Sequence, residues 1–367
     1  MPRKPEPRRA CIALADWPAP DHAAWQQAIA GRMRALGAYS YARRVKMSSI
    51  EKAREGYGRW LGFLRHVGQL DAFASLSQRL TPERLNDYLY ELIALDNADH
   101  GISGRFQELQ SALRIMEPRG DHGWITRPGG VSLRSLLPMK SRHLTLHHPA
   151  DLFLWGLELM QSADDRSGPK RRQVQLRDGL LICVEALRGL RLRTVHSLEL
   201  GRSILRDPDT GLWHLDIPPE DVKNERYIAT ALIRILTPWL DRYVAVERQE
   251  LLQGKASTAF WINWGGQQLG KVGIDKRIRW WSTKRFGADH AFGTHRFRHC
   301  IGSTTPLLLP NHPALAATLL RISQGVLQKN YDRSNDIEAF RQFHAAIDAQ
   351  RKQLARRAPN LFDKQDN

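Results

Sequence analysis

The sequence predicts a mainly α-helical protein of the α+β class, in which a helical domain precedes a mixed domain with a small antiparallel sheet. Three observations support this prediction. The chain has 367 residues, more than one core usually holds, so we expect two domains. Apolar residues recur at helical spacing through most of the chain. The one convincing β signal is a hairpin near residues 203–218.

Composition shifts divide the chain into five segments. Runs rich in Gly, Pro and Arg interrupt the helical pattern after the first helices, and such runs are typical of linkers. The predicted segments are a basic N-terminal appendage (1–47), a helical domain (48–117), a linker (118–150), a mixed domain (151–345) and a C-terminal tail (346–367).

The helical domain is predicted to hold three helices. Ser48 and Glu51 form a capping-box pattern at the start of the first helix. The second lies in "LTPERLNDYLYELIAL", with Thr81 as its N-cap and Pro82 at its first position. The third is expected to end before Pro118, because proline cannot continue a helix.

The mixed domain begins with a helix near residues 150–162 and a strongly apolar helix, "RDGLLICVEALRGL". The segments "SILRD" and "LWHLDIP" flank the turn residues "PDTG", and "YIATALI" is a candidate third strand. Beyond Pro238 the pattern is helical again, apart from a loop at "NWGGQQLG". The segment after Tyr331, "NDIEAFRQFHAAIDAQRKQLARRA", carries an apolar stripe that either packs on its own domain or, by the family resemblance given below, docks on a neighbouring copy.

The net charge of +17 favours a polyanionic partner. Nucleic acid is the first candidate and an anionic membrane the second, although the chain lacks a basic helix with one clean apolar face. No apolar run approaches the roughly 20 residues that span a bilayer. The three cysteines are scattered, as in reduced proteins. We therefore expect a cytoplasmic, nucleoid-associated protein.

Five residues in the C-terminal half suggest metal-free phosphoryl transfer on a nucleic-acid backbone. His295 and Arg298 are three apart and share a helical face. Arg191 follows the apolar helix, Lys223 lies between two predicted strands, and Tyr331 comes last. Two arginines can clamp one phosphodiester, a lysine can protonate a leaving oxygen, and a tyrosine activated by neighbouring cations can attack phosphorus.

These residues resemble the catalytic domain of the tyrosine recombinases, the phage-integrase family. The resemblance is carried by "GLRLRTVHSLEL", the hairpin lysine, "HRFRH" and the late tyrosine, and it extends over roughly residues 48–345. It implies that Arg191, Lys223, His295, Arg298 and Tyr331 are catalytic, with Tyr331 the nucleophile.

The resemblance also gives His299 a supporting role and makes residues 48–117 a core-binding domain on DNA. It implies a site-specific recombinase that uses neither metal nor ATP nor any other cofactor. A homotetramer on double-stranded DNA and the integration or excision of a mobile element would follow. A metal site at His295 and His299 is a poor alternative, because the H-E-x-x-H glutamate is missing.

Two positions depart from the family pattern. Thr194 stands where an acidic residue is usual, three positions after the first arginine, and Ile322 stands where a histidine or tryptophan is usual. Isoleucine cannot donate a hydrogen bond to phosphate, but it can pack. The rival interpretation is therefore a DNA-binding protein of the same fold that has lost turnover.

A basic segment precedes the His–Arg motif. From Lys271 to Arg298 there are eight Lys or Arg residues against two Asp. We expect phosphate contacts from its charges and core positions for Trp280 and Trp281. The candidate DNA contacts are Lys271, Lys276, Arg277, Arg279, Lys284 and Arg285.

Overall fold

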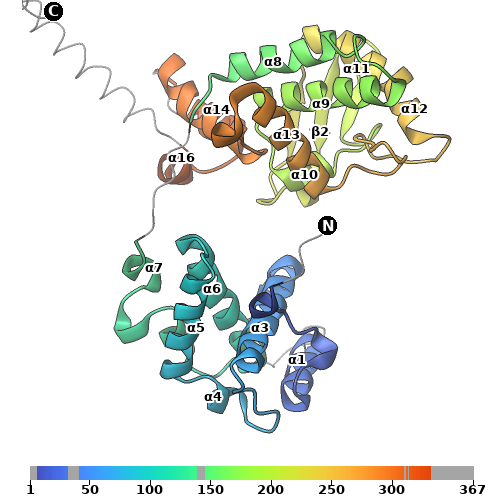
Figure 1. The fold of residues 1–367 in the computed structure, drawn as a ribbon. Coiled ribbons are helices and arrows are strands. Elements are labelled where there is room, and N and C mark those ends of the chain that lie inside the picture. The colour runs from blue at the N-terminus through green and yellow to red at the C-terminus, as the bar shows by residue number, and fades with distance from the viewer. Residues whose placement is uncertain (1–5, 32–40, 139–144, 310, 313, 332–367) are drawn as a thin grey trace, which may run out of the picture. The chain divides into compact units, whose positions relative to one another are not determined.

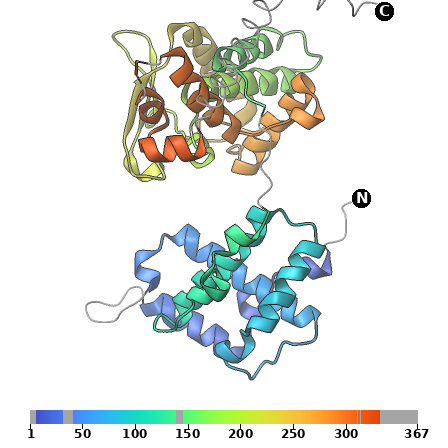
Figure 2. The same cartoon turned by 90° about the vertical axis from the view of Figure 1, so that its left-hand side faces the viewer.

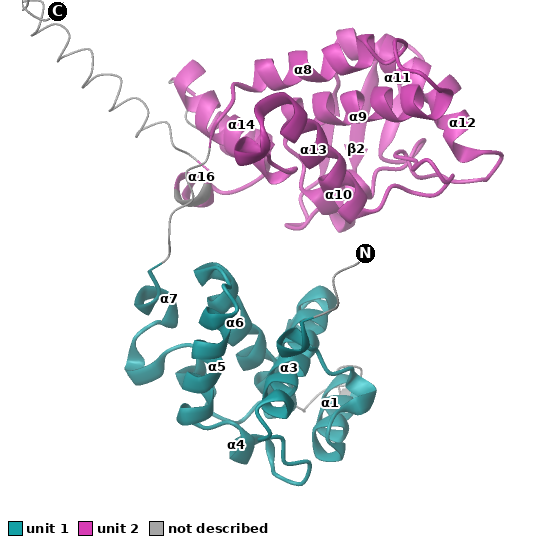
Figure 3. Cartoon of the chain, viewed as in Figure 1, with its two compact units in different colours: residues 1–143 teal, residues 144–367 magenta. Residues whose placement is uncertain are grey.

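The computed structural model describes residues 6–31, 41–138, 145–309, 311–312 and 314–331 (Figure 1). The chain forms two compact units, residues 1–143 and residues 144–367 (Figure 3). The apolar stripe expected in the C-terminal tail lies outside the described residues. Within the described part of the chain, no helix is both long enough and apolar enough to cross a membrane.

The first unit is all-helical. Its helices are α1 (Ala19–Gly31), α2 (Tyr41–Arg44), α3 (Met47–His66), α4 (Leu76–Arg79), α5 (Pro82–Ala94), α6 (Asp99–Met116) and α7 (Leu133–Leu136). The long helices α3 and α6 pack closely where a Cβ on Gly56 would lie 2.4 Å from the Glu108 Cβ. Fully buried leucines, among them Leu61 and Leu109, fill the contact.

Of the two helix starts predicted in the first unit, the structure confirms the one at Thr81 and not the one at Ser48. The Thr81 side chain accepts a hydrogen bond from the Arg84 N–H and Pro82 opens α5, which confirms that prediction. The capping box at Ser48 is not present, because α3 already begins at Met47 with Lys46 as its N-cap residue.

The segments expected to flank the helical domain belong to the first core instead. Ile12, Trp17 and Trp25 are buried in it, and the Ile12 N–H donates to the Gly58 carbonyl. A fully buried ion pair joins Asp21 to Arg79. Residues 118–138 also contribute, through buried Ile125, Leu133 and Leu137. The compact unit is therefore larger than the predicted 48–117, because scattered apolar side chains anchor both flanking segments.

The second unit contains a three-stranded antiparallel sheet of order β1-β2-β3 (Figure 2). The strands are β1 (Ile204–Arg206), β2 (Trp213–Ile217) and β3 (Ile228–Ala231). The Asp207 side chain caps the turn by accepting from the Asp209 and Thr210 N–H groups, and Gly211 adopts φ +67°. The predicted hairpin and third strand are thus confirmed.

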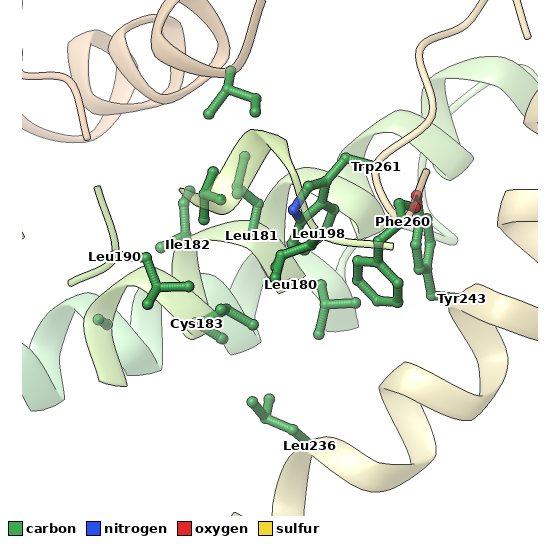
Figure 4. Close-up of a cluster of buried hydrophobic side chains, with 14 of the residues drawn as sticks. Leu180, Leu181, Ile182, Cys183, Leu190, Leu198, Leu236, Tyr243, Phe260 and Trp261 are labelled. Carbon is green, nitrogen blue, oxygen red and sulfur yellow. Dashed lines mark hydrogen bonds between the residues drawn. The ribbon is translucent and has the colours of Figure 1, made fainter. Parts of the chain in front are cut away.

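Helices make up most of the rest of this unit. They are α8 (Pro149–Gln161), α9 (Pro169–Arg188), α10 (Leu192–His196), α11 (Thr237–Arg242), α12 (Arg248–Leu252), α13 (Lys271–Phe286), α14 (His295–Leu308), α15 (Leu315–Leu320) and α16 (Gln324–Asn330). The apolar helix α9 runs through the core, where Leu180 and Leu181 are fully buried, with Phe260 and Tyr243 nearby (Figure 4). Trp281 lies in this core as expected, but Trp280 is 41% exposed.

Candidate active site

The end of α9 positions Arg191. Gly189 ends this helix in a left-handed conformation, φ +49°, and a Cβ there would lie 3.3 Å from the Arg298 Cγ. The chain then turns, and Arg191 becomes the N-cap residue of α10. Its guanidinium is half-buried and donates to the Asn224 Oδ1 at 3.1 Å. Asn224 follows Lys223, so this bond joins the first arginine to the β2–β3 connection.

An aspartate on α13 fixes the start of α14. The Asp275 Oδ1 accepts a hydrogen bond from the Thr294 N–H at 3.2 Å. A Cβ on Gly293 would lie only 2.0 Å from that oxygen, so glycine is required for this approach. His295 then opens the helix, with Arg298 one turn further along and His299 beside it. The predicted shared face of His295 and Arg298 is therefore built on a fixed helix end.

Arg298 is a buried cation that ties together three segments. It is 2% exposed. Its guanidinium donates to the Gly189 carbonyl, to the Leu320 carbonyl at 3.0 Å and to the Tyr331 hydroxyl at 3.5 Å. Its Cζ also lies 5.2 Å from the centre of the Tyr331 ring. The positive charge is thus held in place before any substrate arrives.

Tyr331 caps the C-terminal end of α16. Its ring is 8% exposed and lies 5.4 Å from the His295 ring and 5.0 Å from the His299 ring, between centroids. Its carbonyl accepts a hydrogen bond from the Ser303 hydroxyl at 2.7 Å. The backbone and ring are thereby fixed, with the hydroxyl directed at a guanidinium.

One cavity of about 650 Å³ collects the predicted residues. It is lined by Leu190, Arg191, Leu192, Lys223, Asp275, Thr294, His295, Val326 and Tyr331. Lys223 is exposed and reaches it from the segment after the 3-10 turn Pro219–Asp221. Arg298 reaches the site through its bond to Tyr331. The structure thus brings all five predicted residues together.

The electrostatics of the site favour a neutral His295. Partial burial lowers its pKa below the ordinary 6.5, and the charges of Arg298 and Arg191 lower it further. A neutral imidazole is the form that accepts a proton. Burial also lowers the pKa of Arg191, as does Arg298, but a guanidinium stays charged in proteins. The site therefore combines fixed cations with one neutral base.

Both departures from the family pattern have a structural explanation. Thr194 is buried, and its hydroxyl donates to the Asp221 carbonyl at 3.1 Å, which ties α10 to the turn before Lys223. Ile322 is 6% exposed and belongs to a small apolar cluster with Ile301, Leu320, Leu327 and Tyr331. Ile322 therefore packs and presents no polar group to the site.

The six candidate DNA contacts have different surroundings. Arg277 pairs with Asp178, Arg279 with Asp275 and Arg285 with Glu158. The Lys284 ammonium lies 3.9 Å from the centre of the Trp280 ring. Lys271 and Lys276 are exposed on α13. Half of the set thus takes part in ion pairs within the unit, and these pairs reduce the charge available to phosphate.

Sequence reasoning missed three polar residues: Asn224, Asp275 and Glu185. Asp275 and Asn224 act through contacts with residues far away in the chain, for which the sequence carries no local signal. Glu185 lies in the strongly apolar second half of helix α9, where a carboxylate between apolar residues is unusual. This acidic residue in an apolar stretch is a signal in the sequence from which an unusual environment of Glu185 could have been predicted.

Glu185 is fully buried, and neither of its carboxyl oxygens has a hydrogen-bond partner in the described part of the chain. Burial raises its pKa well above the ordinary 4.5, while the charge of Arg298 acts in the opposite direction. A folded pKa above the unfolded one means that folding takes up a proton. The free energy of unfolding then falls as the pH rises between the two values.

We expect Glu185→Gln to raise the free energy of unfolding at neutral pH and to flatten its dependence on pH. Glutamine is uncharged at every pH, so the cost of protonating a buried carboxyl disappears. Urea titrations in mildly acidic and mildly alkaline buffers measure both effects. Glu220→Gln, at an exposed position, is the control and should change neither. A less stable Glu185→Gln protein at neutral pH would mean that Glu185 is ionised and paired with Arg298.

The comparison with solved structures bears on the fold. No family profile and no curated protein matches the sequence. Among solved structures, the chain is similar to the XerH site-specific recombinase bound to palindromic difH substrate in a post-cleavage complex. That match has 16% identity and a TM-score of 0.53, and covers 81% of this chain and 80% of the other.

A second match is the pre-cleavage complex of XerH with difH substrate. It has 16% identity and a TM-score of 0.51, and covers 78% of each chain. The fold expected from the sequence motifs, that of the tyrosine recombinases, is therefore confirmed over most of the chain.

Proposed function

We propose that this protein is a site-specific DNA recombinase that cuts and rejoins strands through a 3′-phosphotyrosyl intermediate. One observation carries the proposal. Arg298 donates directly to the Tyr331 hydroxyl at the cavity that Arg191, Lys223 and His295 also line. A buried cation bonded to a tyrosine hydroxyl favours a nucleophilic oxygen, and a phosphate placed beside it would meet two arginines.

In the proposed reaction the Tyr331 oxygen attacks the phosphorus and gives its proton to the neutral His295. The bond from phosphorus to the 5′ oxygen breaks, and Lys223 protonates the leaving oxygen. Arg191 and Arg298 stabilise the charge that develops on the non-bridging oxygens. The 5′ hydroxyl of a partner strand then attacks the phosphotyrosyl bond and releases Tyr331. One phosphodiester is consumed and one is formed, so no ATP is needed.

The partner in this proposal is double-stranded DNA. The net charge of +17 supports it, and XerH, with the same fold, is described in complexes with its difH substrate. In the same proposal the helical unit acts as the core-binding domain, four copies assemble on DNA, and the reaction integrates or excises a mobile element. Because the proposed partner is double-stranded DNA, the proposal also places the protein on the nucleoid.

Binding to duplex DNA is expected to weaken steeply with salt, because lysines and arginines that contact phosphates release condensed counterions. About 8 such contacts give a log–log slope near −7. Fluorescence anisotropy of a labelled duplex at several salt concentrations measures the slope. A slope near zero would contradict duplex DNA as the partner.

The direct test is a nicked duplex that carries the cognate site, found by sequencing the DNA that co-purifies with the protein. The nick lets the cleaved 5′ fragment diffuse away, so a covalent intermediate accumulates. We expect a protein–DNA adduct on a denaturing gel. Tight, specific binding without an adduct would favour the rival function, a DNA-binding protein of the same fold that has lost turnover through Thr194 and Ile322.

A further inference from the structure

A second cavity, of about 550 Å³, lies in the second unit apart from the candidate active site. Its lining combines cations with indole rings, and we call it the tryptophan pocket. It is lined by Arg166, Lys170, Arg171, Val174, Gln175, Trp264, Arg277, Trp280, Trp281 and Lys284. It shares no lining residue with the 650 Å³ cavity. Its volume lies within the range typical of small-ligand sites.

The cations of the tryptophan pocket carry a net positive charge. Among the described residues, only Arg277 of its five cations forms an ion pair, with the buried Asp178. Arg166 donates to the Gln175 side chain, a neutral partner. Lys170 and Arg171 are exposed at the start of α9. Unneutralised cations around one cavity favour an anionic ligand.

Two of the three indoles are already engaged. The Trp281 N–H donates to the Asp178 Oδ2 at 2.8 Å, and its ring packs edge-on against Trp280. The Trp280 ring has the Lys284 ammonium 3.9 Å from its centre and the Arg277 Cζ at 4.6 Å. These contacts hold the two cations in fixed places at the wall of the pocket.

Trp264 is different, because its ring is 70% exposed. In the described part of the chain, no other ring and no cation packs on it. Its loop is nevertheless well fixed: the Gln253 side chain donates to the Trp264 carbonyl at 2.8 Å, and the Asn263 Oδ1 accepts from the Gly265 N–H at 2.7 Å. A rigid loop therefore presents a bare indole face at a cationic pocket, which favours a ligand with a flat ring.

We propose that the tryptophan pocket binds one nucleotide unit, with its base stacked on Trp264 and its phosphate held by Arg166, Lys170 and Arg171. A simple anion would leave the indole unused, and a paired duplex presents only base edges. An unpaired base offers the ring face that stacking requires. The unit has two sources, a free nucleotide or an unpaired nucleotide of a DNA strand. The proposal does not depend on strand cleavage.

The test uses the full chain with two probes, adenosine diphosphate and a fluorescein-labelled short oligothymidylate. The variants are Trp264→Ala, Trp264→Phe and the double change Lys170→Ala/Arg171→Ala. Phe73→Ala is the control, since Phe73 is another exposed aromatic residue, 94% exposed, and belongs to the first unit. All these side chains are exposed, so the variants keep the fold.

For the probe that binds, we expect Trp264→Ala to weaken binding about 5- to 150-fold, the equivalent of one base–aromatic stack of about 1–3 kcal/mol. Trp264→Phe should recover most of this loss, and the double variant should also bind more weakly. If calorimetry shows this pattern with adenosine diphosphate, the source is a free nucleotide. If only the oligothymidylate shows it in anisotropy, the source is an unpaired strand.

Unchanged binding of both probes to Trp264→Ala would overturn the proposal. Pyrophosphate that binds as tightly as adenosine diphosphate would also overturn it, because the base would then contribute nothing. Trp264→Ala is expected to form the covalent adduct on a nicked cognate duplex like the wild type. A failure of the pocket proposal is thereby distinguished from a failure of the recombinase proposal.

Discussion

Replacing Tyr331 with phenylalanine is expected to abolish the covalent protein–DNA adduct while leaving duplex binding near the wild-type level. The change removes one oxygen and keeps the ring, which packs in the apolar cluster with Ile301 and Leu327. The lost hydrogen bond from Arg298 is long, 3.5 Å, so the expected cost in stability is about 0.5–1.5 kcal/mol at most. Without the oxygen no phosphotyrosyl bond can form. A denaturing gel with the nicked duplex measures the adduct.

Tyr243→Phe is the matched control for this experiment. Tyr243 is a buried tyrosine of the same unit whose hydroxyl donates to the Phe260 carbonyl at 2.9 Å, away from the candidate site. Tyr243→Phe removes a tyrosine hydroxyl oxygen, as Tyr331→Phe does, but we expect this variant to form the adduct normally. An adduct that persists in Tyr331→Phe would show that another residue is the nucleophile.

Arg191→Ala is expected to slow adduct formation by about 10²–10³-fold, or roughly 2.7–4 kcal/mol of transition-state stabilisation. The guanidinium is half-buried at the cavity, and within the described residues Asn224 is its one side-chain acceptor, so the remaining donors can reach a phosphate. The fold should survive the change, because only one hydrogen bond is lost. Single-turnover rates of adduct formation at saturating protein measure the effect apart from binding.

Arg193→Ala provides the control for charge alone, since Arg193 is an exposed residue of the same short helix. It should retain the adduct rate and lose only DNA affinity. Arg298→Ala is less informative, because Arg298 is buried and supports the Gly189 and Leu320 carbonyls, so folding and cleavage would fail together. An Arg191→Ala protein that cleaves at the wild-type rate would contradict the proposed clamp.

The residues of the candidate site could be predicted because most of them lie at recognisable ends of, or connections between, predicted helices and strands. Arg191 follows the end of an apolar helix, Lys223 lies between two strands, and His295 and Arg298 share a helical face. Tyr331 could be singled out because no other tyrosine follows Arg298 in the chain. Local pattern and chain order, together with the resemblance to the tyrosine recombinases, were enough to predict that these residues meet at one site.

The sequence could not show features that depend on contacts between distant residues. Ile12 and Trp17 give too short an apolar pattern to reveal that the N-terminal segment packs into the first core. Asp275 was counted only as a charge within a basic segment, yet it holds the start of α14. Trp280 and Trp281 are neighbours on one helix, and only the tertiary fold decides which of them is buried.

The position of Tyr331 in its own small cluster has a consequence for dynamics. Among the described residues its ring packs in a cluster of seven buried side chains from α14, α15, α16 and the turn between the last two, separate from the main core of the unit around α9. A segment with so few buried contacts can open without unfolding the rest, at a free energy below that of global unfolding. Amide hydrogen exchange should therefore be faster in α16 than in α9, and the placement of Tyr331, the proposed nucleophile, would then depend on a local folding equilibrium of its own.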